Sequence, residues 1–297
     1  MTDQTRMTAS DFSPELLELY DFYAHGMITK REFLDRAGKF ALGGLTAAAI
    51  LSMLSPNYAL AEQVSFNDPD IHAEWITYAS PNGHGEMRAY LVRPTAHETA
   101  PGVVVVHENR GLNPYIQDVA RRLAKAGFIA LAPDGLTPLG GYPGNDEQGR
   151  ALQQQVDGEK LMNDFFAAVE FLMAHERVSG KVGITGFCYG GGVANAAAVA
   201  YPELGAAVPF YGRQPDAGDV PKITAPILLH YGGLDERVNA GWPTYERALQ
   251  ENGKVYEAHI YEGANHGFHN DSTPRYDAEA AELAWSRTLD WFHRYLS

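Results

Sequence analysis

The 297-residue sequence contains a single cysteine, Cys188. One cysteine excludes an intrachain disulfide and any metal site with several thiolate ligands. It leaves one free thiol available for chemistry. Cysteine usage therefore gives no indication of the redox compartment.

Basic residues are also scarce: 23 Lys and Arg stand against 37 Asp and Glu, for a formal net charge of −14. Such a charge repels phosphate backbones, so a nucleic-acid partner is disfavoured relative to small molecules. The hydrophobic content of 45% is ordinary for a folded chain. Length and composition together predict one large α/β domain with extra segments.

The N-terminal region also lacks a long hydrophobic run. Its apolar stretch from Phe40 to Leu54 is too short and too weakly apolar for a stable membrane span. Basic residues Lys30-Arg31 precede it, and the small residues Ala59-Leu60-Ala61 follow. This order predicts that residues 1–61 are an export leader of a periplasmic protein, similar to a twin-arginine signal with Lys30 replacing the first arginine. The alternative is a pair of amphipathic helices docked on the domain of a cytoplasmic protein that keeps this segment. The acidic segment 1–27, longer than a usual leader, favours that alternative.

Residues 62–297 have the pattern of a single α/β domain. Two stretches of alternating polarity, 72–79 and 87–92, flank turn-forming residues and predict an antiparallel hairpin. The fully apolar run 103–106 predicts a strand buried on both faces, where a parallel sheet begins. Further strands are expected at 128–132, 182–185, 206–211, 227–231 and 256–261, and helices at 113–127, 152–174, 189–200, 244–251 and 278–295. This alternation predicts a mostly parallel central sheet with helices on both faces and a site at the carboxyl ends of the strands.

The single cysteine lies in the segment Gly186-Phe187-Cys188-Tyr189-Gly190-Gly191, immediately after a predicted strand. Small residues on both sides let the chain turn sharply from strand to helix, as in a nucleophile elbow. A lone cysteine is more often a small buried hydrophobic residue than a catalyst. Its role therefore depends on what other strand ends supply.

Two other strand ends supply an acid and a base. Asp235 follows the strand that ends at Tyr231, and His266 follows the strand that ends at Tyr261. A thiol needs a base, and an imidazole needs an acceptor that holds its tautomer. The order Cys188, Asp235, His266 is the nucleophile, acid, base order of the α/β-hydrolase fold, which predicts a catalytic triad. Taken singly, the aspartate could be a turn former and the histidine a structural residue.

The segment from about Ala73 to Ser297 resembles the dienelactone hydrolase family, a cysteine-dependent branch of the α/β-hydrolase fold. The elbow carries the resemblance, together with Gly233-Leu234-Asp235, Ala264-Asn265-His266-Gly267-Phe268 and His107-Glu108-Asn109-Arg110-Gly111. The resemblance implies that Glu108 contacts the resting cysteine and helps to generate the thiolate when substrate displaces that contact. Otherwise Glu108 would be a strand-end carboxylate that pairs with Arg110 or faces solvent.

The fold predicts two backbone N–H donors for the substrate oxyanion, from Tyr189 at the helix start and from Asn109. The resemblance implies a small lactone or ester substrate, with arginines for a substrate carboxylate. Arg110 and Arg213 are the two candidates, since both follow strand ends, and Arg150 and Arg275 lie near the same loops. Exposed arginines are usually solvated, however. Five aromatic residues could line an apolar pocket or belong to the core: Tyr142, Tyr189, Tyr211, Trp242 and Phe268.

Three other functions remain open at this point. A fold and a triad do not determine substrate, so a broader carboxylesterase or a peptidase-like hydrolase is one alternative. A redox sensor or a non-catalytic relic is the second, with Cys188 as an ordinary thiol. A metal hydrolase is the third and is disfavoured, because His107-Glu108 and His266 to His269 lack metal-site spacing. No cofactor is expected, and activity is expected to be insensitive to chelators.

Overall fold

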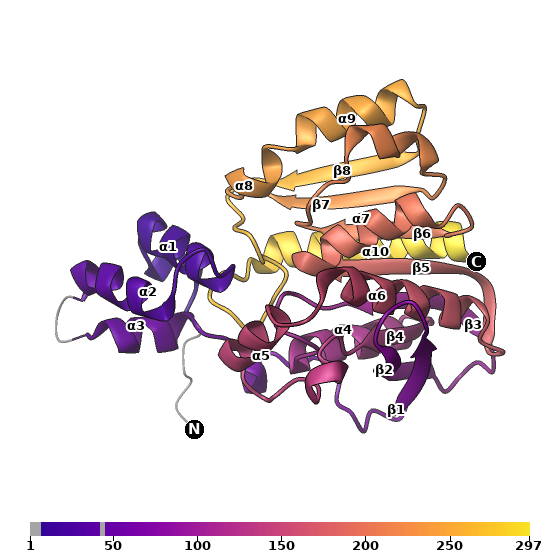
Figure 1. The fold of residues 1–297 in the computed structure, drawn as a ribbon, viewed down its shortest axis with the longest axis horizontal. Coiled ribbons are helices and arrows are strands. Elements are labelled where there is room, and N and C mark those ends of the chain that lie inside the picture. The colour runs from indigo at the N-terminus through magenta and orange to yellow at the C-terminus, as the bar shows by residue number, and fades with distance from the viewer. Residues whose placement is uncertain (1–6, 42–44) are drawn as a thin grey trace.

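The computed structural model describes residues 7–41 and 45–297, which form a sheet domain and a smaller group of helices at its side (Figure 1). The sheet has eight strands in the order β1-β2-β4-β3-β5-β6-β7-β8. Their bounds are β1 Ile71–Ser80, β2 Gly85–Pro94, β3 Ala100–Val106, β4 Ile129–Pro133, β5 Val178–Phe187, β6 Ala206–Phe210, β7 Ile227–Gly232 and β8 Tyr256–Tyr261. The order confirms the α/β-hydrolase fold predicted from the sequence.

The sheet is antiparallel at one edge and parallel elsewhere. β1 and β2 form the predicted hairpin, with Ser80 opposite Gly85, and β2 also pairs antiparallel with β4. The strands from β4 through β3 to β8 all run parallel, so their carboxyl ends meet at one edge. Functional groups on the loops that follow these strands are thereby brought together.

Helices cover both faces of the sheet. Side chains of Val104 and Val106 pack in one core with α6 Gly158–Met173, α7 Tyr189–Ala200 and α9 Trp242–Glu251. Val103 and Val105 point into the opposite core, which contains residues of α4 Pro114–Lys125 and α10 Ala278–Leu296. Alternate side chains of β3 are thus buried on both faces, which is why this strand is continuously apolar.

One predicted helix is two helices in the structure. The amphipathic stretch 152–174 divides between α5 Asp146–Gln153 and α6 Gly158–Met173. Asp157 begins the second helix, since its carboxylate accepts hydrogen bonds from the backbone N–H groups of Glu159 and Lys160. The hydrophobic periodicity of residues 152–174 did not predict this break, because the same pattern is expected from one long helix.

The first part of the chain forms three packed helices: α1 Pro14–Ala24, α2 Lys30–Ala37 and α3 Ala47–Leu54. We call residues 7–41 and 45–62 the N-terminal helical unit. Its core contains the fully buried side chains of Phe33 and Leu54. Thr29 and Glu32 form a capping box at the start of α2, so Lys30 and Arg31 belong to an ordinary helix beginning.

The N-terminal helical unit has the docked arrangement that the sequence offered as the alternative to an export leader. Export remains a prediction, and residues 1–6 and 42–44 of the predicted leader lie outside the described residues. In residues 7–41 and 45–297, no helix has both the length and the apolar composition that crossing a membrane requires. Three short 3-10 helices, Ala9–Asp11, Gly38–Phe40 and Tyr58–Leu60, complete the unit.

Close packing around the elbow makes a glycine there indispensable for stability. A Cβ atom added at Gly190 would overlap the backbone carbonyl oxygens of Val106 and His107. We expect Gly190→Ala to lower the free energy of unfolding by about 3 kcal/mol, because backbone must shift to admit the methyl group. Gly158→Ala is the matched control, since a Cβ there meets nothing within 4 Å. Urea denaturation measures both variants, and equal stabilities would contradict the expectation.

Candidate active site

Cys188 lies on the turn between β5 and α7, in a backbone conformation that is rare for a residue with a side chain (φ 56°, ψ −110°). Its backbone N–H donates to the carbonyl of Phe210 at 3.1 Å, which ties the turn to the neighbouring strand β6. Strained backbone of this kind persists only where the surroundings enforce it. The sharp turn predicted from the elbow sequence is therefore present, with the thiol at the carboxyl edge of the sheet.

His266 and Asp235 meet at the same edge. Asp235 follows β7, His266 follows β8, and both side chains are buried. The Asp235 Oδ2 atom lies 2.5 Å from His266 Nδ1. A carboxylate can only accept, so Nδ1 carries the proton and Nε2 is turned toward Cys188.

A second histidine, His25 from the N-terminal helical unit, stands between the thiol and His266. Its Nε2 atom lies 3.3 Å from Cys188 Sγ and 3.2 Å from His266 Nε2. The role of His25 was not predicted from the sequence. His25 is 163 positions from Cys188 and 241 positions from His266 and belongs to no motif, so no local signal could have identified it.

Side chains around His25 fix its position. Its Nδ1 atom donates to the Asp21 carbonyl at 2.8 Å and lies 3.2 Å from the Asp21 carboxylate. Arg275 Nη1 donates to that carboxylate at 2.9 Å. Arg237 Nη2 lies 3.1 Å from His25 Nε2. The histidine is thus anchored through Asp21 to the sheet domain.

The two histidines favour the thiolate form of Cys188. Burial raises the pKa of the thiol, but His25 and His266 outweigh burial and hold this pKa well below its usual range. Burial lowers the pKa of His266, but the Cys188 thiolate and the hydrogen bond to Asp235 raise it to about 10. Burial also opposes the charged form of His25, whose pKa is raised by Cys188 and Asp21. The site therefore favours a Cys188 thiolate next to a protonated histidine ring.

Glu108 lies directly after β3 and is buried with polar partners. Its Oε2 atom accepts a hydrogen bond from Asn270 Nδ2 at 3.1 Å and lies 3.7 Å from Arg110 Nε. Burial raises the pKa of Glu108, Arg110 lowers it, and Cys188 raises it further. Glu108 thus has the pairing with Arg110 that the sequence offered as its alternative role, while His25 contacts the resting sulfur.

The two predicted oxyanion donors come from the expected elements. Tyr189 is the first residue of α7, so its backbone N–H lies at a helix N-terminus, where negative charge is stabilised. Asn109 lies in the loop after β3, and its side chain donates to the Ala24 carbonyl at 2.9 Å. That bond ties the loop to α1, immediately before His25.

The arginines divide between buried pairs and solvent. Arg110 is buried and donates to Asp146 at 3.2 Å, whereas Arg213 is exposed. Arg150 donates to the Tyr23 carbonyl at 2.6 Å, and Arg275 pairs with Asp21. Two of the four candidate arginines thus bind the N-terminal helical unit. Of the predicted pocket aromatics, Tyr211, Trp242 and Phe268 belong to the core, and Tyr142 lines a cavity.

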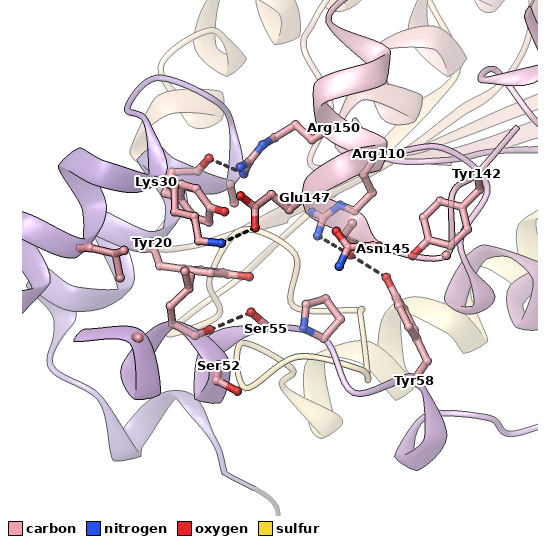
Figure 2. A pocket seen from close by; sticks show the side chains of 18 residues that line it. Tyr20, Lys30, Ser52, Ser55, Tyr58, Arg110, Tyr142, Asn145, Glu147 and Arg150 are labelled. Atoms are coloured by element: carbon pink, nitrogen blue, oxygen red, sulfur yellow. Dashed lines mark hydrogen bonds and ion pairs between the residues drawn. The ribbon is translucent and has the colours of Figure 1, made fainter. Parts of the chain in front are cut away.

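A cavity of about 440 Å³ lies between the N-terminal helical unit and the segment around α5 (Figure 2). Lys30 bonds Glu147 across it at 2.6 Å, and Tyr58 donates to Asp146 at 2.7 Å. Its wall includes Arg110 and Arg150 but neither Cys188 nor His266. The cavity is therefore distinct from the thiol site, and residues Tyr20, Tyr23 and Ala24 of α1 contribute to its wall.

Comparison with known proteins places this geometry in a family. Residues 87–296 match the model of the dienelactone hydrolase family, and residues 4–41 match a model described as YqhI-like. A Bradyrhizobium protein named as a 2-oxo-3-(5-oxofuran-2-ylidene)propanoate lactonase is 35% identical over 240 residues, which cover 76% of this chain and 96% of that protein.

Two further relatives cover different parts of the chain. An Escherichia coli K12 protein named as the hydrolase fragment YghX is 70% identical over 114 residues, 38% of this chain and 97% of its own length. A crystal structure named as a dienelactone hydrolase from Klebsiella pneumoniae superposes with a TM-score of 0.66 at 29% identity. It covers 75% of this chain and all of its own. The sheet domain therefore has the fold of that structure.

Proposed function

Because the chain belongs to the dienelactone hydrolase family and is a hydrolase, we propose that it opens a lactone or cleaves a small ester through Cys188, His266 and Asp235. The observation that supports this proposal is the ordered contact set at one sheet edge. Asp235 orients the imidazole of His266, which faces a cysteine at a strained elbow. These are the relations that nucleophilic catalysis needs.

In the first half of the reaction the Cys188 thiolate attacks the carbonyl carbon of the substrate. The carbonyl π electrons move to oxygen, where the backbone N–H groups of Tyr189 and Asn109 stabilise the negative charge. The intermediate collapses, the bond from carbon to the ring or ester oxygen breaks, and imidazolium His266 protonates that oxygen. A thioester on Cys188 results, and in a lactone the new hydroxyl stays attached to the acyl group.

In the second half, neutral His266 takes a proton from water as the water oxygen attacks the thioester carbon. The carbon–sulfur bond breaks, the carboxylic acid is released, and the thiolate is restored beside imidazolium His266. Asp235 keeps the proton on Nδ1 throughout, so that Nε2 alone exchanges protons with the reacting groups.

An anionic substrate agrees best with the charges around the thiol. The Asp21 carboxylate occupies this neighbourhood, held by Arg275 at 2.9 Å, with Arg237 Nε 3.8 Å away. Once Asp21 moves away, a substrate carboxylate could pair with the guanidinium groups of Arg275 and Arg237 in its place. The lactone in the name of the Bradyrhizobium relative carries a carboxylate of this kind.

Substrate entry requires His25 to move. Its ring nitrogen contacts both Cys188 Sγ and His266 Nε2, and the reacting carbonyl must approach those same two atoms to about 3–3.5 Å. In the proposed reaction this arrangement is the closed resting form. We expect α1 to carry His25 and Asp21 away together in an open form, since the two are hydrogen-bonded within one helical turn.

Trapping the acyl-enzyme tests this proposal directly. Wild-type protein is mixed with p-nitrophenyl acetate or an unsaturated lactone and quenched in acid within the first turnover. We expect mass spectrometry to find one acyl group, attached to the peptide that contains Cys188. A panel of lactones and esters, with and without a carboxylate, then defines the substrate class. Product formation with acyl transfer to another residue would refute the proposed nucleophile.

A further inference from the structure

Three metal-ligating atoms converge where the N-terminal helical unit meets the catalytic edge: Nε2 of His25, Sγ of Cys188 and Nε2 of His266. All lie within 4.8 Å of one another. We propose that they bind a zinc ion, and that bound zinc fastens the N-terminal helical unit over the thiol. A sequence search for metal sites could not find this set, because its ligands come from three distant segments.

Two of the three separations between the ligand atoms are close to those of tetrahedral zinc. With Zn–N bonds of about 2.05 Å and Zn–S bonds of about 2.3 Å, two nitrogens lie about 3.3 Å apart and a nitrogen and a sulfur about 3.6 Å apart. The two nitrogens here are separated by 3.2 Å, and His25 Nε2 and the sulfur by 3.3 Å. These two separations are within a few tenths of an ångström of the zinc values, and Cys188 Sγ and the His266 ligand atom lie within 4.8 Å of each other, so the third pair can close on a bound ion.

Both histidines present the correct tautomer for a metal. Each has its Nδ1 atom against a carboxylate, Asp21 for His25 and Asp235 for His266. Nδ1 therefore carries the proton, and the Nε2 lone pairs of two neutral rings would face each other at 3.2 Å. Lone pairs at that distance repel unless a proton or a cation lies between them. Carboxylates behind the imidazoles are also the usual outer partners of zinc-bound histidine.

The donor set selects among metals. One thiolate and two imidazoles suit a thiophilic divalent ion such as zinc, and the oxygen-preferring ions magnesium and calcium find no oxygen ligand among these three side chains. Three protein ligands leave one coordination position for water. Zinc here would not assist hydrolysis, because it engages the sulfur and the nitrogen that the proposed reaction needs. The metal-bound form is therefore inactive.

Arg237 opposes the metal and provides an internal test. Its guanidinium Nη2 lies 3.1 Å from the same His25 Nε2 atom that zinc would use. The side chain is 42% exposed, and its Nε atom lies 3.8 Å from the Asp21 carboxylate, so the guanidinium can turn toward solvent while it remains near Asp21. Removing this competing positive charge should tighten zinc binding.

Zinc binding to the full chain is measured by equilibrium dialysis after metal removal, with folding verified by circular dichroism. We expect one zinc per wild-type chain. His25→Ala should weaken binding more than about 100-fold, and Asp21→Asn about 10-fold, as expected for a ligand and an outer partner. Arg237→Ala should bind more tightly, and His97→Ala, an exposed histidine in the loop before β3, should match the wild type. Less than one zinc per chain, or equal binding by His25→Ala, would overturn the proposal.

Cobalt(II) as a spectroscopic substitute identifies the sulfur ligand. Wild-type protein should develop an intense near-ultraviolet band from thiolate-to-cobalt charge transfer, together with the visible bands of a tetrahedral ion. Cys188→Ser should lose the charge-transfer band. A wild-type spectrum that lacks it would exclude Cys188 as a ligand and with it the proposed site.

The inhibitory effect of zinc, unlike its binding, depends on the proposed hydrolase function. Stoichiometric zinc should suppress ester turnover by the wild type, excess chelator should restore it, and His25→Ala should require far more zinc. The proposed zinc inhibition differs from the expectation from the sequence alone, in which chelators leave activity unchanged. If no ester or lactone is turned over, the hydrolase proposal fails while dialysis and cobalt spectra still decide the metal site. Zinc bound as described with turnover unaffected would overturn the fastening role.

Discussion

Replacing Cys188 with alanine is expected to lower kcat/KM for an activated ester by at least about 10⁴-fold, the size of effect seen when a nucleophile is removed from a catalytic triad. The reason is that no other side chain at the elbow can form the covalent intermediate. Backbone donors at Tyr189 and Asn109 remain, so a small residual rate over water is expected. The measurement is initial-rate kinetics of the metal-free proteins with p-nitrophenyl acetate at neutral pH.

Alanine at this position should leave the fold intact, because the Cys188 backbone, not its sulfur, forms the bonds that hold the turn. The control is His97→Ala, purified in parallel, whose exposed side chain lies away from the catalytic edge. Urea denaturation should give Cys188→Ala nearly wild-type stability. Turnover within tenfold of the wild type in a folded Cys188→Ala protein would contradict the assignment and favour the redox or relic interpretation.

The sheet domain was largely predictable because its signals are local. The run 103–106 is apolar throughout since β3 is buried on both faces, and the predicted helix 189–200 has the same bounds as α7. Asp235 and His266 could be placed at one edge because parallel strands end together. Their mutual contact follows from topology, which the alternation of strands and helices specifies.

The N-terminal helical unit illustrates what local signals cannot provide. Thr29 and Glu32 cap α2, and a helix that starts with Lys30 and Arg31 looks like the basic region of an export signal. Small apolar residues before Leu54 equally suit a leader and a helix packed in a core. The docked packing depends on tertiary contacts, among them the one that joins His25 to a thiol 163 positions away, and export remains a prediction.

Charge pairing explains why the substrate arginines were also hard to assign. Arg110 and Arg213 follow strand ends, yet one is buried with Asp146 and the other is exposed. Arg275, which the sequence placed only near the site, binds the carboxylate beside His25. Sequence position indicates which edge an arginine occupies, but its partner depends on loops whose paths are set by packing.

In the proposed mechanism, the same contacts relate the N-terminal helical unit to catalysis. Asp21 forms an ion pair with Arg275, and His25 contacts both Cys188 and His266. One helical turn therefore occupies the groups that an anionic substrate would otherwise bind. A buried arginine or thiolate without a partner is costly. Docking therefore supplies partners for these buried groups, and in the proposed reaction a substrate would have to compete with it.

His266 has two separable effects, on turnover and on the ionisation of Cys188. His266→Ala is expected to lower kcat by about 10³- to 10⁴-fold, since it removes the group that protonates the leaving oxygen and activates water. It should also raise the pKa of Cys188, because His266 is one of the two histidines that hold this pKa below its usual range. The second, His25, provides the matched comparison, as His25→Ala should raise the thiol pKa while keeping the proposed base.

Iodoacetamide alkylation of Cys188 as a function of pH measures the second effect. A thiol with a lowered pKa is thiolate above that pKa, so the metal-free wild type should react at a nearly constant rate through neutral pH and slow only in acid. Each single variant should move the midpoint toward higher pH. The double variant should approach the ordinary thiol value of about 8.5, subject to a further rise from burial. Superimposable profiles for all four proteins would show that neither histidine stabilises the thiolate, and the proposed base would have to be sought elsewhere.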